Sequence, residues 1–405
     1  MLWLYNIGIS FYGLIVSAFS IFNSKAKLFS QGRKNIFDHI EKALDGTKKH
    51  IWFHFASLGE FEQGRPLLEK IKELHPQKRI VITFFSPSGY EIRKNYALAS
   101  GVFYLPLDTA GNAKRFISLI NPEMAIFTKY EFWYHYFKTL NDQQIPLYLI
   151  SGIFRPNQIF FRWYGSFHRR ILGFVDHFFV QNTESVNLLK QLQLENVSLS
   201  GDTRFDRVAE NALSPKKVTL VENGWINNPV FIAGSTWPAD ERLIAVLIQQ
   251  QPDWQFIIAP HEIDEAHIHD IEKLIPGAVR YSNLDNGTAS RPQTLIIDNI
   301  GLLSSLYQYA SISYIGGGFG VGIHNTLEAA AFGTPVIFGP KYDKFQEAKD
   351  LIALTAARSI ETESDLSAAF THFRENKEAG KIAQKYVNEK TGSTRQILEF
   401  IEKQF

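Results

Sequence analysis

Short strand-like runs alternate with helical stretches along both halves of the chain. Runs of three to seven β-branched, aromatic or other apolar residues lie at residues 51–55, 79–85, 124–127, 147–150 and 177–180, and again at 230–233, 254–258, 295–297, 312–315 and 336–338. Helical patterns, such as the one at residues 66–74, lie between most of them. This alternation predicts an α/β fold with two parallel sheets, each covered by helices on both faces.

A polar stretch at residues 211–228 separates the two series of runs and is the expected linker. We therefore expect Rossmann-like, doubly wound domains at residues 25–210 and 229–385. A terminal helix at residues 386–405 is expected to pack back on the first domain. Such domains bind ligands in the cleft at the carboxyl ends of their strands.

The amino terminus has the pattern of a membrane anchor. Residues 1–22 contain no charged side chain and are long enough to cross a bilayer, and Lys25, Lys27, Arg33 and Lys34 follow at once. A cleaved signal peptide has its positive charge before the apolar run, whereas here it follows. The positive-inside rule then places the rest of the chain in the cytoplasm. Residues 1–24 are thus a predicted anchor, spanning or lying in the interface; a buried core helix is the alternative.

Composition excludes several classes of function. The 405 residues carry a net charge of +1, without the basic excess of a nucleic-acid binder. No cysteine is present, which rules out disulfides and thiolate metal sites.

A glycine cluster after residues 312–315 is the most informative feature for function. It contains Gly316, Gly317, Gly318, Gly320 and Gly322, and the segment His324, Asn325 and Thr326 leads from it into an alanine-rich helix. Glycine lets a backbone approach a ligand closely, and a helix start attracts anions. Glu328 is placed to accept hydrogen bonds from sugar hydroxyls. This pattern predicts a nucleotide-sugar site, because the dinucleotide fingerprint and the Walker A sequence are both absent; a tight turn without a ligand is the alternative.

Further polar residues follow predicted strands. Ser235 and Thr236 offer donors suited to phosphate, and His261 follows the next strand. His267 and His269 lie nearby, but this segment lacks the spacing of a zinc motif, so no metal is expected and these histidines are predicted to be solvated.

Two acidic residues follow strands of the first half. Glu60 is expected at a helix start, where the helix dipole would keep it ionised and able to accept a proton; a plain capping role is the alternative. Glu131 would position an acceptor hydroxyl or pair with Lys129.

These residues lie in motifs that resemble the lipid A Kdo transferases, which move 3-deoxy-D-manno-octulosonic acid (Kdo) from CMP-Kdo to a lipid A precursor. The similarity is strongest in GIHNTLEAAAFGTPVIFGP at residues 322–340, and it recurs in HFASLGE at 54–60 and GDTRFD at 201–206. Shorter matches lie at AGST, Pro260-His261 and residues 298–310. The order is kept over nearly the whole chain.

The resemblance implies a GT-B glycosyltransferase and an inverting, metal-free transfer to a glucosamine 6-hydroxyl. Glu60 would be the general base, with Glu131 on the acceptor side. Donor contacts would come from Ser235, Thr236, His261, Gly316, Gly317, Gly318, His324, Asn325, Thr326 and Glu328, and weaker anion contacts from Lys129, Arg155, Arg204 and Lys341. No cofactor is expected, and the partners would be CMP-Kdo, the lipid A precursor and the cytoplasmic face of the inner membrane, with no nucleic acid.

The chain departs from the family pattern mainly in its acceptor half. Many members read Glu-x-Glu-x-Trp-Pro-Asn where residues 129–135 read KYEFWYH, and an arginine-rich segment is replaced by SGIFRPNQ at 151–158. Trp237 and Lys344 stand where histidine and asparagine are frequent. The identity of the acceptor and the number of sugars therefore stay open.

Aromatic and cationic residues alternate over residues 160–170, as suits an anionic membrane surface; a buried amphipathic helix is the alternative. Two other functions compete with Kdo transfer. One is a different GT-B nucleotide-sugar transferase or a sugar-nucleotide epimerase, and the other is a non-catalytic, membrane-tethered nucleotide-binding protein.

Overall fold

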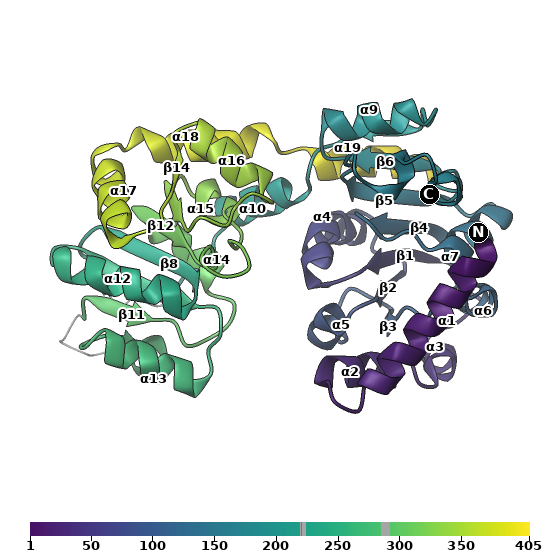
Figure 1. Ribbon diagram of the computed structural model, residues 1–405, viewed down its shortest axis with the longest axis horizontal. Helices are drawn as coiled ribbons and strands as arrows, with labels where there is room; N and C mark the ends of the chain where they lie inside the picture. The colour runs from purple at the N-terminus through teal and green to yellow at the C-terminus, as the bar shows by residue number, and fades with distance from the viewer. Residues whose placement is uncertain (219, 221–223, 285–291) are drawn as a thin grey trace. The chain divides into compact units, whose positions relative to one another are not determined.

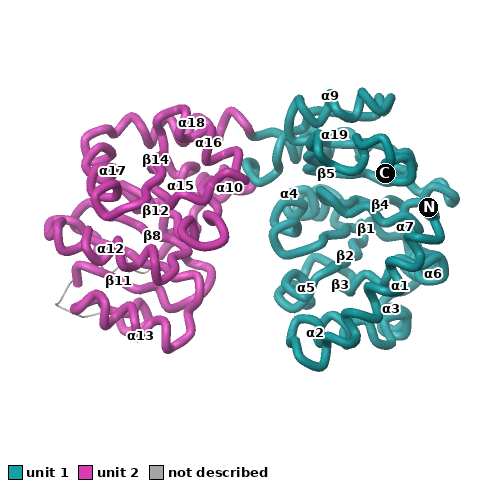
Figure 2. The backbone as a smooth tube through the Cα atoms, viewed as in Figure 1, with its two compact units in different colours: residues 1–206, 391–405 teal, residues 207–390 magenta. Residues whose placement is uncertain are grey.

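The computed structural model describes residues 1–218, 220, 224–284 and 292–405 (Figure 1). The chain divides into two compact units, coloured separately in Figure 2. Unit 1 comprises residues 1–206 and 391–405, and unit 2 comprises residues 207–390. The predicted linker at 211–228 begins inside a helix, and part of it lies outside the described residues.

Unit 1 is built on one parallel sheet. Its strands are β1 (His50–Phe55), β2 (Ile80–Phe84), β3 (Gly101–Tyr104), β4 (Pro122–Thr128), β5 (Leu147–Gly152), β6 (His177–Val180) and β7 (Val197–Leu199). Its helices are α1 (Leu2–Phe19), α2 (Ser24–Gly32), α3 (Ile36–Ala43), α4 (Leu58–Leu74), α5 (Pro87–Arg93), α6 (Ala110–Ile120), α7 (Tyr134–Asp142), α8 (Ser166–Leu172), α9 (Thr183–Gln191) and α19 (Ser393–Ile401), with 3₁₀ turns at Ile159–Phe161 and Glu402–Gln404. Helix α10 (Arg204–Leu213) carries the chain into unit 2.

The seven strands of unit 1 lie in the order β3-β2-β1-β4-β5-β6-β7. The order reverses between β1 and β4, and this reversal is the topological switch point at which doubly wound sheets bind ligands. Strand β1 is buried along its whole length because helices cover both faces of the sheet. One face packs against α3, α6, α7, α8 and α9. The other packs against α4, α5 and α19.

Helix α1 is long and apolar enough, by length and composition alone, to cross a membrane, and none of its residues is buried. One side of it nevertheless lies against unit 1. The Tyr5 hydroxyl donates to Asp108, and Asn6 Oδ1 lies 2.7 Å from His135 Nε2. Farther along the helix, the Tyr12 ring packs 5.9 Å from the ring of Phe29. The other side of α1 exposes large apolar side chains, namely Trp3, Leu4, Ile7, Phe11, Leu14, Ile15 and Phe19.

Unit 2 repeats the design. Its strands are β8 (Val230–Thr236), β9 (Gln255–Pro260), β10 (Val279–Arg280), β11 (Thr294–Ile296), β12 (Ile312–Ile315), β13 (Val336–Phe338) and β14 (Ala357–Ser359). Its helices are α12 (Pro238–Gln250), α13 (Glu265–Leu274), α14 (Leu303–Leu306), α15 (Leu327–Ala331), α16 (Gln346–Ala353), α17 (Glu363–Glu375) and α18 (Glu378–Glu389), with 3₁₀ turns at Tyr281–Asn283 and Tyr307–Tyr309. The strand order β10-β11-β9-β8-β12-β13-β14 reverses between β8 and β12, which is a second switch point.

The terminal helix expected at residues 386–405 is two elements in the structure. Helix α18 ends at Glu389 in unit 2, and α19 begins at Ser393 in unit 1. Asp206 fixes the start of α19, because its carboxylate accepts hydrogen bonds from the backbone N–H groups of Gly392 and Thr394. Ile397, Leu398 and Ile401 of α19 then complete the core beneath β1 and α4.

Candidate active site

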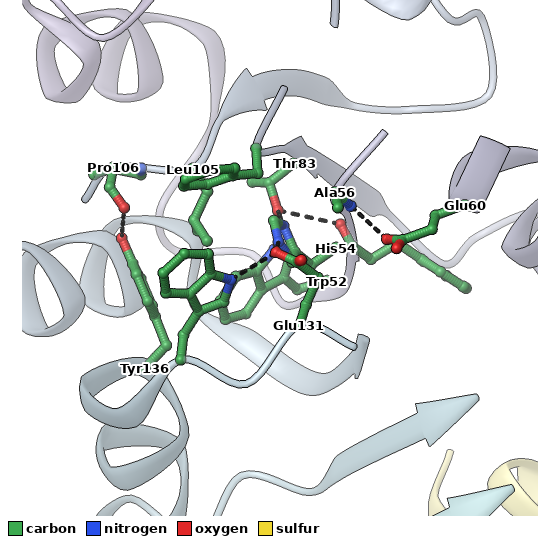
Figure 3. Close-up of polar contacts among 12 residues, drawn as sticks. Trp52, His54, Ala56, Glu60, Thr83, Leu105, Pro106, Glu131 and Tyr136 are labelled. Atoms are coloured by element: carbon green, nitrogen blue, oxygen red, sulfur yellow. Dashed lines mark hydrogen bonds and ion pairs between the residues drawn. The ribbon is translucent and has the colours of Figure 1, made fainter. Parts of the chain in front are cut away.

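The carboxyl end of β1 leads directly into α4, and Glu60 lies in the first turn of that helix. Its Oε2 accepts a 2.7 Å hydrogen bond from the backbone N–H of Ala56 (Figure 3). The carboxylate is thereby held over the end of β1. Nearby Ser57, the residue before α4, makes no capping hydrogen bond with its side chain.

Glu131 follows β4, the neighbour of β1 across the switch point. Its Oε2 accepts a 2.9 Å hydrogen bond from Trp133 Nε1 and lies 3.2 Å from His54 Nε2. The side chain of Glu131 is 14% exposed, so it remains open to solvent. The sheet thus places Glu60 and Glu131, far apart in sequence, at one edge.

A chain of buried side chains behind Glu131 fixes the orientation of His54 (Figure 3). Trp52 Nε1 donates to Thr83 Oγ1 at 2.8 Å, and Thr83 Oγ1 lies 2.8 Å from His54 Nδ1. Because the Glu131 carboxylate only accepts, the imidazole proton lies on Nε2, facing it, and Nδ1 accepts from the Thr83 hydroxyl. Burial lowers the pKa of His54, so the ring is neutral at pH 7. His54, Thr83 and Trp133 are missing from the site predicted by sequence.

Burial, with the charge of Glu131 adding to it, raises the pKa of Glu60 to about 7. The hydrogen bond from Ala56 and the charge of Lys129 oppose this rise but are smaller. The helix start was predicted to keep Glu60 ionised; with a pKa near 7 the carboxyl is instead partly protonated at neutral pH, because desolvation outweighs the hydrogen bond from Ala56 and the charge of Lys129. A carboxyl with this pKa exchanges protons readily at neutral pH, as a general base must.

The weaker cation candidates of unit 1 have separate surroundings. Lys129 adopts a left-handed backbone (φ 59°) at the turn after β4 and acts electrostatically on Glu60. Arg155 donates a 3.0 Å hydrogen bond from Nη1 to the hydroxyl of Tyr130. Tyr130 directly precedes Glu131 in the sequence. Arg204 forms an ion pair with Asp202, 2.8 Å between Nη2 and Oδ2. Of these three candidates, Lys129 is the one whose charge acts on Glu60 among the described residues.

In unit 2 the glycine turn passes directly over the end of β8. A Cβ added at Gly316 would lie 2.2 Å from the backbone oxygen of Ser235, so no larger residue fits there. Gly317 has φ +90° and donates its N–H to Asp240 Oδ2 at 3.0 Å. The glycines thus let two segments of backbone pack closely at the second switch point, and the predicted approach to a ligand stays a prediction.

Two buried acids lie beneath this turn. Asp240 also accepts from the hydroxyl of Tyr314 at 2.7 Å, and Glu241 accepts from Thr236 Oγ1 at 2.9 Å. The hydroxyl proton of Thr236 is therefore used within the protein, contrary to the expectation that it is offered to a ligand. Glu241 also lies 3.0 Å from His267 Nε2. The His267 side chain is only 11% exposed, so the expectation that it is solvated was wrong.

Three rings stack beside the turn. The ring of His261 lies 4.9 Å from that of Trp237 and 4.4 Å from that of His324. His324 Nε2 accepts from Trp237 Nε1 at 3.2 Å, so its proton is on Nδ1. Burial and neighbouring His261 lower the pKa of His324 to about 4, which keeps it neutral at pH 7. Trp237 was not among the predicted site residues. It holds both predicted histidines in place, by stacking on His261 and donating to His324.

The remaining candidates for binding the sugar donor lie near α15. Asn325 accepts from the N–H of Leu327 at 3.1 Å and donates to Glu328 Oε1 at 3.1 Å. Thr326 is buried, and its hydroxyl has no hydrogen-bond partner among the described residues. Lys341 Nζ donates to the carbonyl of Gly320 at 2.7 Å and so braces the glycine turn; Gly318 accepts from the Lys341 N–H at 3.0 Å. Within the described ranges, no three His, Asp or Glu residues gather as a metal site would require.

Comparison with known proteins agrees with this picture. A family model described as 3-deoxy-D-manno-octulosonic-acid transferase (kdotransferase) matches residues 31–207. The 3-deoxy-D-manno-octulosonic acid transferase of Aquifex aeolicus is 25% identical over 373 residues, which cover 89% of this chain and 96% of that protein.

Two solved structures resemble the fold. A putative UDP-N-acetylglucosamine 2-epimerase from Listeria monocytogenes has a TM-score of 0.60 at 14% identity, covering 88% of this chain and 96% of its own. MurG of Acinetobacter baumannii has a TM-score of 0.55 at 10% identity, covering 88% of this chain and 100% of its own. These likenesses confirm the predicted GT-B fold of two Rossmann-like units. With a family model over residues 31–207 and a relative that aligns along most of its length at 25% identity, the chain is similar to the 3-deoxy-D-manno-octulosonic acid transferases.

Proposed function

We propose that the protein is an inverting glycosyltransferase that moves Kdo from CMP-Kdo to the glucosamine 6-hydroxyl of a lipid A precursor. The similarity to 3-deoxy-D-manno-octulosonic acid transferases supports the transfer of Kdo. The observation that carries the proposal is the pairing of Glu60 and Glu131 at the switch point of unit 1, with the pKa of Glu60 near 7.

Glu60 is the general base of this reaction. Its carboxylate takes the proton of the acceptor hydroxyl as that oxygen forms a bond to the anomeric carbon of Kdo. The bond from that carbon to the CMP phosphate breaks at the same time, and CMP leaves with the electron pair. One displacement inverts the anomeric configuration, so one base suffices and no covalent intermediate forms.

Glu131 orients the acceptor and tunes the base. Its Oε2 is held by Trp133 and His54, which leaves Oε1 to accept a hydrogen bond from a sugar hydroxyl. His54 acts through Glu131 and is a positioning residue, since it is fully buried behind that carboxylate.

The donor binds at the second switch point. Backbone N–H groups of Ser235 and Gly318 suit the CMP phosphate, because glycine permits close approach, whereas the N–H of Gly317 is held by Asp240. His261 and His324 offer ring nitrogens to the phosphate or the Kdo carboxylate, and Glu328 accepts from the ribose. The hydroxyl of Thr236 supports the turn from below, through Glu241, and makes no direct contact.

Helix α1 places the enzyme at the cytoplasmic face of the inner membrane. Its polar side is fixed to unit 1 by Tyr5 and Asn6, and its exposed side is apolar along its length. A helix docked in this way lies in the interface with one face among the lipids.

The experiment that tests the proposal is mass spectrometry of a lipid A precursor incubated with the protein and CMP-Kdo. We expect a mass gain of one or more Kdo units, and the size of the gain counts the sugars. A parallel incubation with UDP-N-acetylglucosamine tests for epimerisation, for which we expect no product. Unchanged acceptor with CMP-Kdo, or conversion of the UDP-sugar, would refute the proposal.

Glu131→Gln is expected to shift the acidic limb of the pH profile of kcat/KM, where Glu60 loses its proton, to lower pH. The substitution keeps an acceptor for His54 and Trp133 but removes the charge that helps to raise the pKa of Glu60. The limb should fall below pH 7 and stay above 4.5, because burial is the larger cause of the rise.

The measurement is kcat/KM between pH 5 and 9 at fixed ionic strength. Glu123→Gln is the matched control, since Glu123 lies on β4, the strand that Glu131 follows, but pairs with Lys78, 3.0 Å away. A limb that is unchanged in Glu131→Gln, or that moves equally in both variants, would contradict the electrostatic coupling.

A further inference from the structure

A pocket of about 340 Å³ opens between the first turn of α1 and the segment that leads into α8. It is lined by Met1, Leu4, Tyr5, Ile159, Tyr164, Phe167 and His168. The lining is apolar or aromatic apart from His168, whose pKa burial lowers, so that ring is neutral at pH 7. A volume of this size is at the lower end of the range of small-ligand pockets, roughly 300–1,000 Å³.

The walls of the pocket are held in place by the core of unit 1. The Phe167 ring stacks 5.2 Å from that of Tyr134 and lies 5.5 Å from that of Tyr5. A Cβ added at Gly165 would lie 2.0 Å from the carbonyl oxygen of Ile159, so the turn formed by residues 159–165 is tight. The cavity is therefore preformed.

The rim of the pocket has the character of a membrane surface. Trp163 is 91% exposed and Tyr164 is 48% exposed, whereas Phe160 and Phe167 of the same predicted patch are buried in the core. Arg162 and Arg170 are exposed beside them, and residues 1–37 and 143–175 contain no acidic side chain. Exposed aromatic rings and unopposed cations suit an anionic headgroup layer.

The pocket is also continuous with the exposed apolar side of α1. Leu4 lines the pocket and is 50% exposed, and it belongs to the outward row that continues along the helix. A hydrocarbon chain reaching the pocket from a bilayer would thus contact apolar surface throughout. Tyr5 links the pocket to the acceptor side, because the N–H of Tyr134 donates to its hydroxyl and neighbouring Trp133 donates to Glu131.

We propose that this pocket binds one acyl chain of a membrane lipid, with the headgroup at the rim formed by Trp163, Tyr164 and the neighbouring arginines. The chain belongs either to the acceptor of the proposed reaction or to a bilayer phospholipid, and only the first source rests on the proposed function.

The test uses the full-length protein on vesicles of an anionic phospholipid with a diazirine at the end of one acyl chain. After photolysis, peptides are mapped by mass spectrometry. We expect adducts in residues 159–168 at least five-fold above those on other exposed segments. Leu4→Asp should abolish that enrichment, and Leu14→Asp is the matched control, because Leu14 is 69% exposed on the same helix and does not line the pocket.

Adducts are counted per vesicle-bound protein, so weaker membrane binding by both variants does not affect the comparison. An unlabelled lipid A precursor that lowers the labelling of residues 159–168 identifies the acceptor as the source, and labelling that it leaves unchanged identifies the phospholipid. Labelling spread evenly along α1, or equal in the two variants, would overturn the proposal. Pocket labelling in a protein that transfers no Kdo would refute the proposed function and leave the acyl-chain site standing.

Discussion

Glu60→Gln is expected to lower kcat for Kdo transfer by about 10²–10⁴, the range that a positioned general base contributes. Glutamine keeps the shape of the side chain and can still accept the hydrogen bond from Ala56. What it loses is the ability to take a proton. The KM values for donor and acceptor should therefore change little.

The same variant should be more stable than the wild type at alkaline pH. The pKa of Glu60 is raised from 4.5 to about 7 in the folded protein, so the folded state holds the proton more tightly than the unfolded chain. Wild-type stability then falls as the pH rises from 4.5 to 7 and stays lower above 7, by on the order of 3 kcal/mol. Glutamine has no such penalty.

Both effects are measured on one pair of proteins. Steady-state transfer gives kcat, and urea unfolding at pH 5 and pH 8 gives the free energy of unfolding. Glu73→Gln is the control, since Glu73 lies at the far end of the same helix and is 62% exposed. Retained activity in Glu60→Gln, or the same pH dependence of stability as in the wild type, would remove Glu60 from the role of base.

Asp108→Ala is expected to lower the free energy of unfolding of unit 1 by about 3–5 kcal/mol, the effect of leaving several buried donors without an acceptor. Asp108 is 1% exposed, and its carboxylate accepts from the backbone N–H groups of His135 and Tyr136, each at 3.0 Å. These are first-turn groups of α7, where Trp133 supplies no capping side chain. Asp108 thus caps α7 from a distant segment and also accepts from Tyr5 of α1.

Tyr5→Phe separates the two roles. It removes the link to α1 and the hydroxyl that accepts from the N–H of Tyr134, so we expect a loss of about 1–2 kcal/mol with the N–H groups of His135 and Tyr136 still protected. Amide hydrogen exchange distinguishes the variants: Asp108→Ala should expose the N–H groups of His135 and Tyr136 and all of α1, whereas Tyr5→Phe should affect α1 and the N–H of Tyr134. An Asp108→Ala protein within 1 kcal/mol of the wild type would contradict the capping role.

The layout of the sheets was predictable from sequence because central strands are buried on both faces. Every strand that the apolar runs identified lies inside its sheet. The strands that the pattern missed among the described residues are β3, β7, β10 and β14, and these are the edges of the two sheets. An edge strand is covered less and needs fewer apolar residues, so its sequence gives no comparable signal.

A candidate site residue was predictable from the sequence when it directly follows a central strand. Glu60, Glu131 and Gly316 follow strands that meet at switch points, and strand order brings such residues together. The hydrogen-bond partners of individual side chains were not predictable from the sequence. His54 reads as one more residue of a buried strand until Thr83 is seen beside it, and Thr236 reads as a free donor until Glu241 is seen beneath it.

Helix α19 delays the point during synthesis at which the core of unit 1 can be completed. Unit 1 lacks Ile397, Leu398 and Ile401 of its core until the last residues of the chain have been synthesised. Unit 2 occupies residues 207–390, and its synthesis takes about 10–40 s at roughly 5–20 residues per second. For that time the nascent first unit carries an open apolar face, together with the exposed row of α1. A stop codon anywhere in unit 2 would therefore yield a first domain that lacks these three core residues.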